Sequence, residues 1–289
     1  MTTQLITSIV ELRTLLDNHR TIGESVGFVP TMGFLHDGHG SLMRAARATN
    51  DVVVASIFVN PLQFAANEDL GSYPRDIEHD TDLARTNGVR YLFVPDVAEM
   101  YPLDRVLTTV SVAELSARWD GASRPTHFAG VATVVTKLFN IVGPCHSYFG
   151  QKDFQQLAII RQMVADLSIP VEVVGCPIIR ENDGLAMSSR NVYLSPEDRA
   201  AATVLRKALD AGEAAIRDGE ADPSAVADTI ARVVEAEPRA RLDYVAVVDP
   251  ATLETPEQIE AETRLLIAAY LGQTRLIDNS AALRLVDQE

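Results

Sequence analysis

Short apolar runs alternate with stretches of helical periodicity over the first 175 residues. The apolar runs are rich in β-branched or aromatic residues, as expected of buried strands, and they lie at 26–30, 52–59, 91–94, 147–150 and 171–175. The stretches between them have the spacing of helices, at 41–48, 76–87, 127–142 and 153–167. This alternation predicts an α/β fold with a Rossmann-like, doubly wound parallel sheet.

The pattern changes after about residue 177. Ser195 followed by Pro196 is typical of a helix start, because serine caps free N–H groups and proline fits the first turn. An alanine-rich helix to about Arg217 and a helix over 223–234 follow, and strands are expected at 241–248, 264–271 and 274–278. We therefore expect a Rossmann-like domain over 1–178 and a smaller C-terminal α+β domain over 179–289.

Charge and composition exclude several classes of function. The chain has 25 Lys and Arg against 40 Asp and Glu, a formal net charge of −15, which repels nucleic-acid phosphates and anionic lipids. No apolar run approaches the roughly 20 residues of a membrane-spanning helix, and residues 1–18 lack the pattern of a signal peptide. The two cysteines, Cys145 and Cys176, make no disulfide framework. We expect a cytoplasmic protein that binds neither nucleic acid nor membrane.

The first group of candidate site residues follows the strand predicted at 26–30, in the sequence PTMGFLHDGH from Pro30 to His39. Ligands of open α/β sheets bind at the carboxyl ends of strands, and a helix N-terminus attracts anions. His36 and His39 are three residues apart, so both side chains can face one phosphate and donate hydrogen bonds to it. Two surface histidines in a turn, or part of a zinc site, are the alternatives, although no third zinc ligand has a matching spacing.

A second cluster, Gly150-Gln151-Lys152-Asp153, also stands where a strand leads into a helix. Lys152 can supply a point charge for phosphate, and Asp153 can cap the helix, bind a ribose hydroxyl or help to hold a metal ion. A plain turn with a capping aspartate explains the same residues.

Two further clusters carry polar side chains of suitable chemistry. Met187-Ser188-Ser189-Arg190 combines two hydroxyls with a guanidinium, which fits an anion-binding loop or an ordinary polar linker. Asn60 and Gln63 follow the strand at 52–59, and their amides suit hydroxyl and carboxylate groups, although Asn60 is equally typical of a turn. The P-loop, G-x-G-x-x-G, G-x-S-x-G and H-E-x-x-H motifs are all missing from the sequence.

Taken together, the H-x-G-H and M-S-S-R sequences resemble the HIGH and KMSKS signatures of class I nucleotidyltransferases. Seven segments then resemble, in order, the pantoate–β-alanine ligase (pantothenate synthetase) family: 30–39, 58–64, 73–75, 127–131, 149–156, 180–191 and 274–279. Phe34, Asp37, Gly40 and the segment 145–147 depart from the residues usual in that family. None of these departures removes a residue that we assign to the chemistry.

The resemblance implies an ATP-dependent condensation of pantoate with β-alanine to pantothenate, through a pantoyl adenylate, with release of AMP and pyrophosphate. It further implies Mg²⁺ with the ATP, a homodimer, and a C-terminal domain that acts as a lid. The catalytic residues it implies are His39, His36 and Lys152. The ATP-binding residues it implies are Pro30, Thr31, Met32, Gly33, Phe34, Leu35, His36, Asp37, Gly38, His39, Gly150, Gln151, Lys152, Asp153, Ile179, Met187, Ser188, Ser189 and Arg190.

For pantoate, the resemblance implies Gln63, Gln156, Val134 and Val135, with Gln63 also contacting β-alanine; it identifies no metal ligand. A valine stripe at helical spacing is equally typical of a core. Three other functions are weighed against this one: a nucleotidyltransferase acting on a phosphate, an RNA-binding relative of the aminoacyl-tRNA synthetases, and a module that binds ATP without turnover. Gln63 and Gln156 argue against a nucleotidyltransferase acting on a phosphate, and the net charge argues against an RNA-binding protein.

Overall fold

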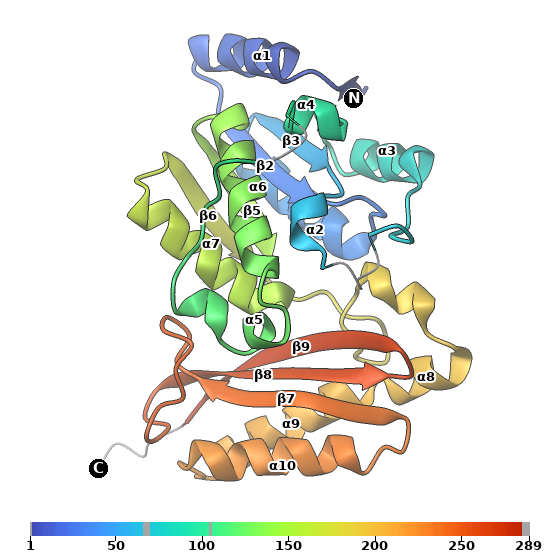
Figure 1. Ribbon diagram of the computed structural model, residues 1–289, viewed down its shortest axis with the longest axis vertical. Coiled ribbons are helices and arrows are strands. Elements are labelled where there is room, and N and C mark those ends of the chain that lie inside the picture. Colours follow the sequence, from blue (N-terminus) through green and yellow to red (C-terminus); the bar gives the residue numbers. More distant parts are fainter. Residues whose placement is uncertain (1, 66–69, 104–105, 285–289) are drawn as a thin grey trace. The chain divides into compact units, whose positions relative to one another are not determined.

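The structure is a computed structural model and describes residues 2–65, 70–103 and 106–284. The chain forms two compact units, coloured along the sequence in Figure 1. The first contains the chain up to Ala117 together with Gly121–Gln151 and Gln156–Ile178, and the second contains Arg118–Asp120, Lys152–Gln155 and everything from Ile179 onward. The sequence pattern contains no sign that the two short segments belong with the second unit.

The first unit is built on a six-stranded parallel sheet with the order β1-β4-β3-β2-β5-β6. Its strands are β1 (Gln4–Ile6), β2 (Val26–Thr31), β3 (Val52–Ile57), β4 (Tyr91–Phe93), β5 (Cys145–Gly150) and β6 (Val171–Cys176). This confirms the predicted parallel α/β sheet and five of its strands. The pattern missed β1, which is only three residues long, and the helix α1 (Ile9–Thr21), whose buried residues are Leu12 and Leu16 alone.

Helices cover both faces of this sheet. After α1 the helices in this part of the chain are α2 (Asp37–Thr49), α3 (Ile77–Thr86), α4 (Val97–Met100), α5 (Asp120–Ser123), α6 (His127–Val142) and α7 (Phe154–Asp166), and the 3-10 turns are η1 (Pro61–Gln63), η2 (Leu115–Ala117) and η3 (Gln151–Asp153). On one face, Phe139 of α6 makes edge-to-face contacts with Phe28 of β2 and Phe149 of β5. On the other, Met43 of α2 packs in a cluster with Val29 and Val53. Phe28 and Val29, two consecutive residues of β2, therefore face different helices.

The strand order places a switch point beside β2. From β2 the chain continues to β3 and β4 on one side of the sheet, whereas β5 pairs with β2 on the other side. The carboxyl ends of β2 and β5 are therefore neighbours from which the chain leaves in different directions, which is where open α/β sheets bind ligands. The candidate site residues predicted from the sequence follow both of these strands, at Pro30–His39 and at Gly150–Asp153.

The second unit is a three-stranded antiparallel sheet with two helices, α9 (Val204–Arg217) and α10 (Pro223–Glu235), on one face (Figure 1). Its strands are β7 (Ala240–Val248), β8 (Glu262–Leu271) and β9 (Thr274–Leu283), and η4 (Ser189–Tyr193) and α8 (Pro196–Ala201) precede α9. The alanine-rich helix expected as one element is two, α8 and α9. The break falls at Ala202 and Thr203, where the Thr203 hydroxyl donates to the Ala200 carbonyl.

Strand β9 is longer than the sequence pattern predicts. The expected strand ended at Asp278 because three polar residues, Asp278, Asn279 and Ser280, interrupt the apolar alternation. In the structure all three are buried within the strand, and arginine side chains contact the first two. Paired polar side chains can thus occupy positions that a hydrophobic pattern assigns to the surface.

Candidate active site

The turn after β2 has a backbone that few residues adopt without support. Gly33 and Phe34 both have positive φ, 87° and 50°. A Cβ on Gly33 would lie 2.9 Å from Ile57 and 3.1 Å from the carboxylate of Asp80, so glycine is required there. Phe34 carries a side chain in the same left-handed region, which costs energy unless the surroundings hold it.

Asp80 of α3 supplies that support. Its Oδ2 accepts the amide N–H of Phe34 at 2.8 Å and its Oδ1 accepts that of Leu35 at 2.6 Å, while the side chain is buried. Burial raises the pKa of Asp80, and the two backbone hydrogen bonds oppose that rise. Asp80 was not among the candidate residues, because an acidic residue in a polar helix gives no sign that it is buried against a loop 46 residues away.

His36 and His39 form a capping box at the start of α2. His36 is the N-cap, and its Nδ1 accepts the N–H of Gly38 at 3.2 Å; the Nδ1 of His39 accepts the N–H of His36 at 3.3 Å. The two ring centroids are 4.1 Å apart. The structure thus confirms that both histidines lie together at this turn. Since each Nδ1 accepts a hydrogen bond, the neutral ring carries its proton on Nε2, so both imidazoles are Nε2–H donors.

Gln63 lies in η1 and is buried. Its Nε2 donates to the Met32 sulfur at 2.9 Å, and its Oε1 accepts from Asn60 Nδ2 at 3.2 Å. The Tyr101 hydroxyl donates to Asn60 Oδ1 at 3.0 Å, and burial raises the pKa of Tyr101 to about 12, so this hydroxyl stays a donor at neutral pH. The structure therefore brings Gln63 to the histidine turn through Met32.

The main chain of Gln63 is fixed from α6. His127 Nδ1 lies 2.9 Å from the carbonyl oxygen of Gln63, and because that oxygen only accepts, Nδ1 must carry the proton. Gly130 allows the close approach, since a Cβ there would lie 2.3 Å from the carbonyl oxygen of Leu62. His127 thus contacts the backbone that carries Gln63.

The other residues expected to bind pantoate lie on α6 and α7. Val134 and Val135 are buried on α6, as the core interpretation of the valine stripe also predicts. Gln156 belongs to α7, and it begins the part of that helix assigned to the first unit.

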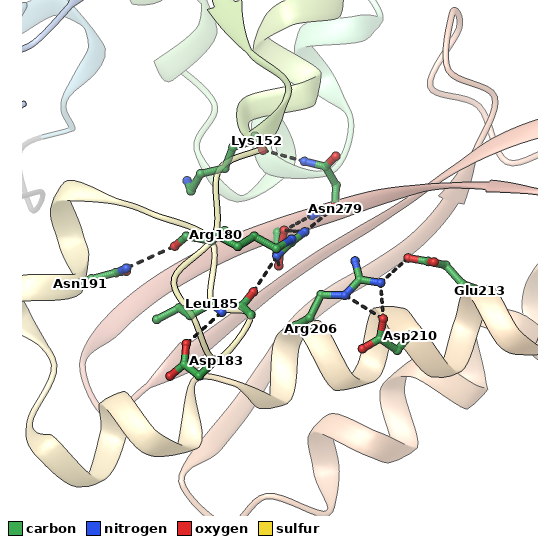
Figure 2. Close-up of polar contacts among 12 residues, drawn as sticks. Lys152, Arg180, Asp183, Leu185, Asn191, Arg206, Asp210, Glu213 and Asn279 are labelled. Carbon is green, nitrogen blue, oxygen red and sulfur yellow. Dashed lines mark hydrogen bonds and ion pairs between the residues drawn. The ribbon is translucent and has the colours of Figure 1, made fainter. Parts of the chain in front are cut away.

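Lys152 belongs to the second unit, where its carbonyl oxygen accepts a 2.7 Å hydrogen bond from Asn279 Nδ2 of β9 (Figure 2). Its Nζ lies 3.5 Å from Asp153 Oδ1. Two residues further on is Phe154, and the Arg264 guanidinium lies over its ring, 4.2 Å from the ring centroid. Asn279 and Arg264 were not among the candidate residues, although 274–279 was noted as a family segment.

The Met187–Arg190 segment follows a short hairpin of the second unit. The Met187 N–H donates to the Ile179 carbonyl at 3.0 Å, which pairs the two residues expected beside the nucleotide base or ribose. Ser188 caps η4, with its hydroxyl accepting the Arg190 N–H at 3.3 Å. Ser189 and Arg190 begin that 3-10 turn.

Ion pairs hold this hairpin from two sides. Arg180 makes a two-point contact with the buried Asp278 carboxylate, at 2.6 and 3.0 Å. Arg199 of α8 pairs with Glu181 at 2.5 Å and with Asp183 at 2.7 Å. The hydrogen bond from Arg199 lowers the pKa of the Asp183 carboxyl.

The remaining candidates lie at strand ends and at a helix start, and α2 begins at Asp37, before the helix expected at 41–48. Pro30 and Thr31 end β2, Asp37 and Gly38 begin α2, and Gly150 ends β5 directly before Gln151. Leu35 is part of the apolar cluster beneath the histidine turn.

Two features are absent from the residues that the structure describes, 2–65, 70–103 and 106–284. In those ranges, no three His, Cys, Asp or Glu side chains are grouped as metal ligands. None of the helices there combines the length and the apolar character needed to cross a membrane.

Comparison with known proteins gives a consistent family. The profile described as pantoate-beta-alanine ligase matches residues 4–281. The pantothenate synthetase of Sinorhizobium medicae is 55% identical over 275 residues, 95% of this chain and 94% of the relative. That of Caldicellulosiruptor bescii is 50% identical over 275 residues, 95% of this chain and 97% of the relative.

Solved structures show the same likeness in three dimensions. A pantothenate synthetase from Thermus thermophilus superimposes with a TM-score of 0.91 at 48% identity, covering 96% of this chain and 99% of that one. A pantoate-beta-alanine ligase from Francisella tularensis, solved in complex with beta-gamma ATP and beta-alanine, gives 0.81 at 32% identity, covering 98% of both chains.

Proposed function

Because the chain belongs to the pantoate–β-alanine ligase family, we propose that it condenses pantoate with β-alanine through a pantoyl adenylate. The observation that carries this proposal is the capping box of His36 and His39, which follows the end of β2. The box fixes two Nε2–H donors at the N-terminus of α2. The complex of the Francisella relative with beta-gamma ATP and beta-alanine supports ATP and β-alanine as substrates.

In the first step an oxygen of the pantoate carboxylate attacks the α-phosphorus of ATP, and the bond to the β,γ-pyrophosphate breaks. Negative charge gathers on the phosphate oxygens in the transition state. His39 and His36 donate to these oxygens from Nε2, and a preorganised donor of this kind contributes roughly 3–4 kcal/mol to the lowering of the barrier. The Asp80 carboxylate holds the turn, so the donors need no rearrangement when charge develops.

The triphosphate is also held by Lys152 and by the hydroxyls and guanidinium of Ser188, Ser189 and Arg190. The base and ribose lie against the turn from Pro30 to Asp37, the residues Gly150, Gln151 and Asp153, and the Ile179–Met187 pair. Mg²⁺ would neutralise the phosphate charge, with phosphate oxygens and water as most of its ligands. Asp153, whose carboxylate is half exposed beside Lys152, is the residue of this segment with the chemistry to contact it.

In the second step the β-alanine amine attacks the acyl carbon of the adenylate, and the bond to the AMP oxygen breaks. Gln63 is suited to bind pantoate and β-alanine, because its Nε2 donates to the thioether sulfur of Met32. A thioether sulfur is a weak acceptor, so a substrate oxygen in its place would accept a stronger hydrogen bond. Gln156 would bind further pantoate oxygens, and Val134 and Val135 the gem-dimethyl group. The resemblance also implies a cytoplasmic homodimer.

A product assay tests this function. Purified protein is incubated with ATP, Mg²⁺, pantoate and β-alanine, and AMP is separated from ADP by chromatography. AMP formation that requires both the acid and the amine is the expected result. ADP instead would mean transfer of the γ-phosphoryl group and would contradict the proposal, and tight ATP binding without turnover would identify a binding module.

The role of Gln63 has its own test. We expect Gln63→Ala to raise the KM for pantoate by about tenfold or more and the KM for ATP by less than about twofold, since the interaction removed is made with pantoate and β-alanine but not with ATP. Steady-state kinetics with each substrate varied in turn measures the difference. An unchanged pantoate KM would show that Gln63 lies outside the pantoate site.

A further inference from the structure

One amide in the second unit joins two positions that the proposed function needs to be fixed. Asn279 donates from Nδ2 to the carbonyl oxygen of Lys152 at 2.7 Å, and its Oδ1 accepts from Arg264 Nε at 2.9 Å (Figure 2 shows the first contact). The side chain is buried, with 2% of its surface exposed.

The orientation of this amide is determined by its partners. An arginine N–H only donates, so the atom of Asn279 facing Arg264 must be the oxygen. A carbonyl oxygen only accepts, so the atom facing Lys152 must be the nitrogen. A flipped amide would place two donors together on one side and two acceptors on the other. Asn279 is therefore locked by both neighbours.

Arg264 is itself held in place and is costly to move. It is buried, and its guanidinium lies over the Phe154 ring. Burial lowers the pKa of Arg264 to about 10, against the opposing effect of Glu262 and Asp278, so the group remains a cation at neutral pH. The segment that carries Lys152 is thus held from β8 and β9 at two points, its carbonyl oxygen and the ring that follows it.

The neighbouring residue of β9 reaches the hairpin that leads to Met187–Arg190. Asp278 accepts both contacts from Arg180, and the Asn279 carbonyl oxygen accepts a third from Arg180 Nη2 at 3.3 Å. Two adjacent residues of one strand therefore support both of the phosphate-binding segments proposed for the second unit.

We propose that Asn279 is a positioning residue for ATP binding, which acts by fixing the main chain of Lys152. This inference rests on the proposed role of Lys152 in holding the triphosphate. It assigns no contact between Asn279 and substrate.

The test variant is Asn279→Asp, which keeps the size of the side chain and an oxygen for Arg264 but removes the N–H that Lys152 requires. We expect the Kd for a non-hydrolysable ATP analogue, measured by calorimetry, to rise about tenfold, and the pantoate KM to stay within about twofold. Ser280→Ala is the matched control, because Ser280 is the next residue of β9 and, within the described residues, its buried hydroxyl has no hydrogen-bond partner. It should leave both values unchanged.

A double-mutant cycle separates positioning from general destabilisation. Lys152→Ala sets the size of the lysine contribution, and in that background Asn279→Asp should change the Kd for the analogue by less than about twofold, because it has no ammonium left to position. Equal effects in both backgrounds, or a parallel rise in the pantoate KM, would overturn the inference. So would an unchanged Kd in Asn279→Asp, or in Lys152→Ala.

Folding is monitored by fluorescence. The chain has one tryptophan, Trp119, which lies in the second unit with its ring 6.0 Å from that of Tyr244. If Asn279→Asp loses the native emission, Asn279→Ser, which retains a donor of smaller size, replaces it and should show a smaller rise in Kd in the same cycle. AMP formation by the wild-type protein decides the proposed function, whereas ATP binding by these variants decides the inference.

Discussion

The histidine turn of the first unit and the hairpin of the second unit, in which Arg180 pairs with Ala186, are held in different ways. The turn rests on the buried carboxylate of Asp80, which accepts two consecutive main-chain N–H groups, and on the capping box of the two histidines. The hairpin rests largely on ion pairs, of which those of Arg199 with Glu181 and Asp183 are partly exposed.

This difference has consequences for stability and for response to solvent. A buried donor left without its acceptor costs about 1–3 kcal/mol, and the contact is little affected by salt. An exposed ion pair contributes about 0–1 kcal/mol and is screened by salt. The turn is therefore preorganised for the charge that develops in adenylation, whereas the hairpin responds to ionic strength and pH.

The largest expected effect is on the turn. His39→Ala should lower the rate of pyrophosphate release by about 10²–10³-fold, because a donor to the transition state is lost. His39→Asn sharpens the result, since its Oδ1 can still accept the His36 N–H and keep the capping box while the Nε2–H is lost. Both variants should release pyrophosphate more slowly by this factor, and His39→Asn should be the more stable of the two. Near wild-type release by either one would remove His39 from the chemistry.

Asp80→Asn tests the support beneath the turn. An asparagine offers one acceptor oxygen for two N–H groups, so we expect a loss of about 1–3 kcal/mol in the free energy of unfolding and a higher KM for ATP. Urea unfolding and steady-state kinetics measure the two. Asp82→Asn is the control on the same helix, where the exposed carboxylate pairs only with Arg85 in the described contacts. Equal losses in both variants would contradict the role given to Asp80.

Arg199→Gln tests the hairpin. The loss of two partly exposed ion pairs should cost at most about 1 kcal/mol each at low salt and less at about 1 M salt. Thermal unfolding of both proteins over a salt series gives the comparison. A difference that salt leaves unchanged would mean that the hairpin is held as the turn is.

The smallest expected effect is that of pH on Asp183. The hydrogen bond from Arg199 lowers its pKa below the usual 3.8, so its ionised form stabilises the fold above that pH, and the contribution is lost as the pH falls through the folded value. The Tm of Asp183→Asn should lie slightly below that of the wild type at neutral pH, and the gap should close as the pH falls below the lowered pKa of Asp183 in the folded protein. A gap that stays constant on acidification would contradict this.

Local elements of the fold were largely predictable. The periodicity predicts a helix over 127–142, and α6 has those bounds. The Ser-Pro pair predicts a helix start, and Ser195 caps α8 with Pro196 at its first position. Caps and periodicities act within a few residues, so the sequence displays them directly. By the same reasoning the H-x-x-H spacing placed two imidazoles on one turn.

Long-range partners were not predictable in the same way. Asp80 and Asn279 each serve a loop far away in the chain, 46 and 127 residues respectively. In the sequence they are an ordinary acidic residue of a polar helix and a polar residue at the end of a strand. Their burial follows from the packing of α3 and the pairing of β9, which no local pattern contains.

The sequence by itself determined the parallel α/β class, most elements, the placement of two histidines at one turn, and the family, because these depend on local periodicity and on motif order. The tertiary structure decided that β2 and β5 are neighbours, that Asp80 carries the turn, and that Lys152 is held by β9. Strand order and burial depend on contacts between distant segments, and those contacts convert ordinary polar residues into supports of the candidate site.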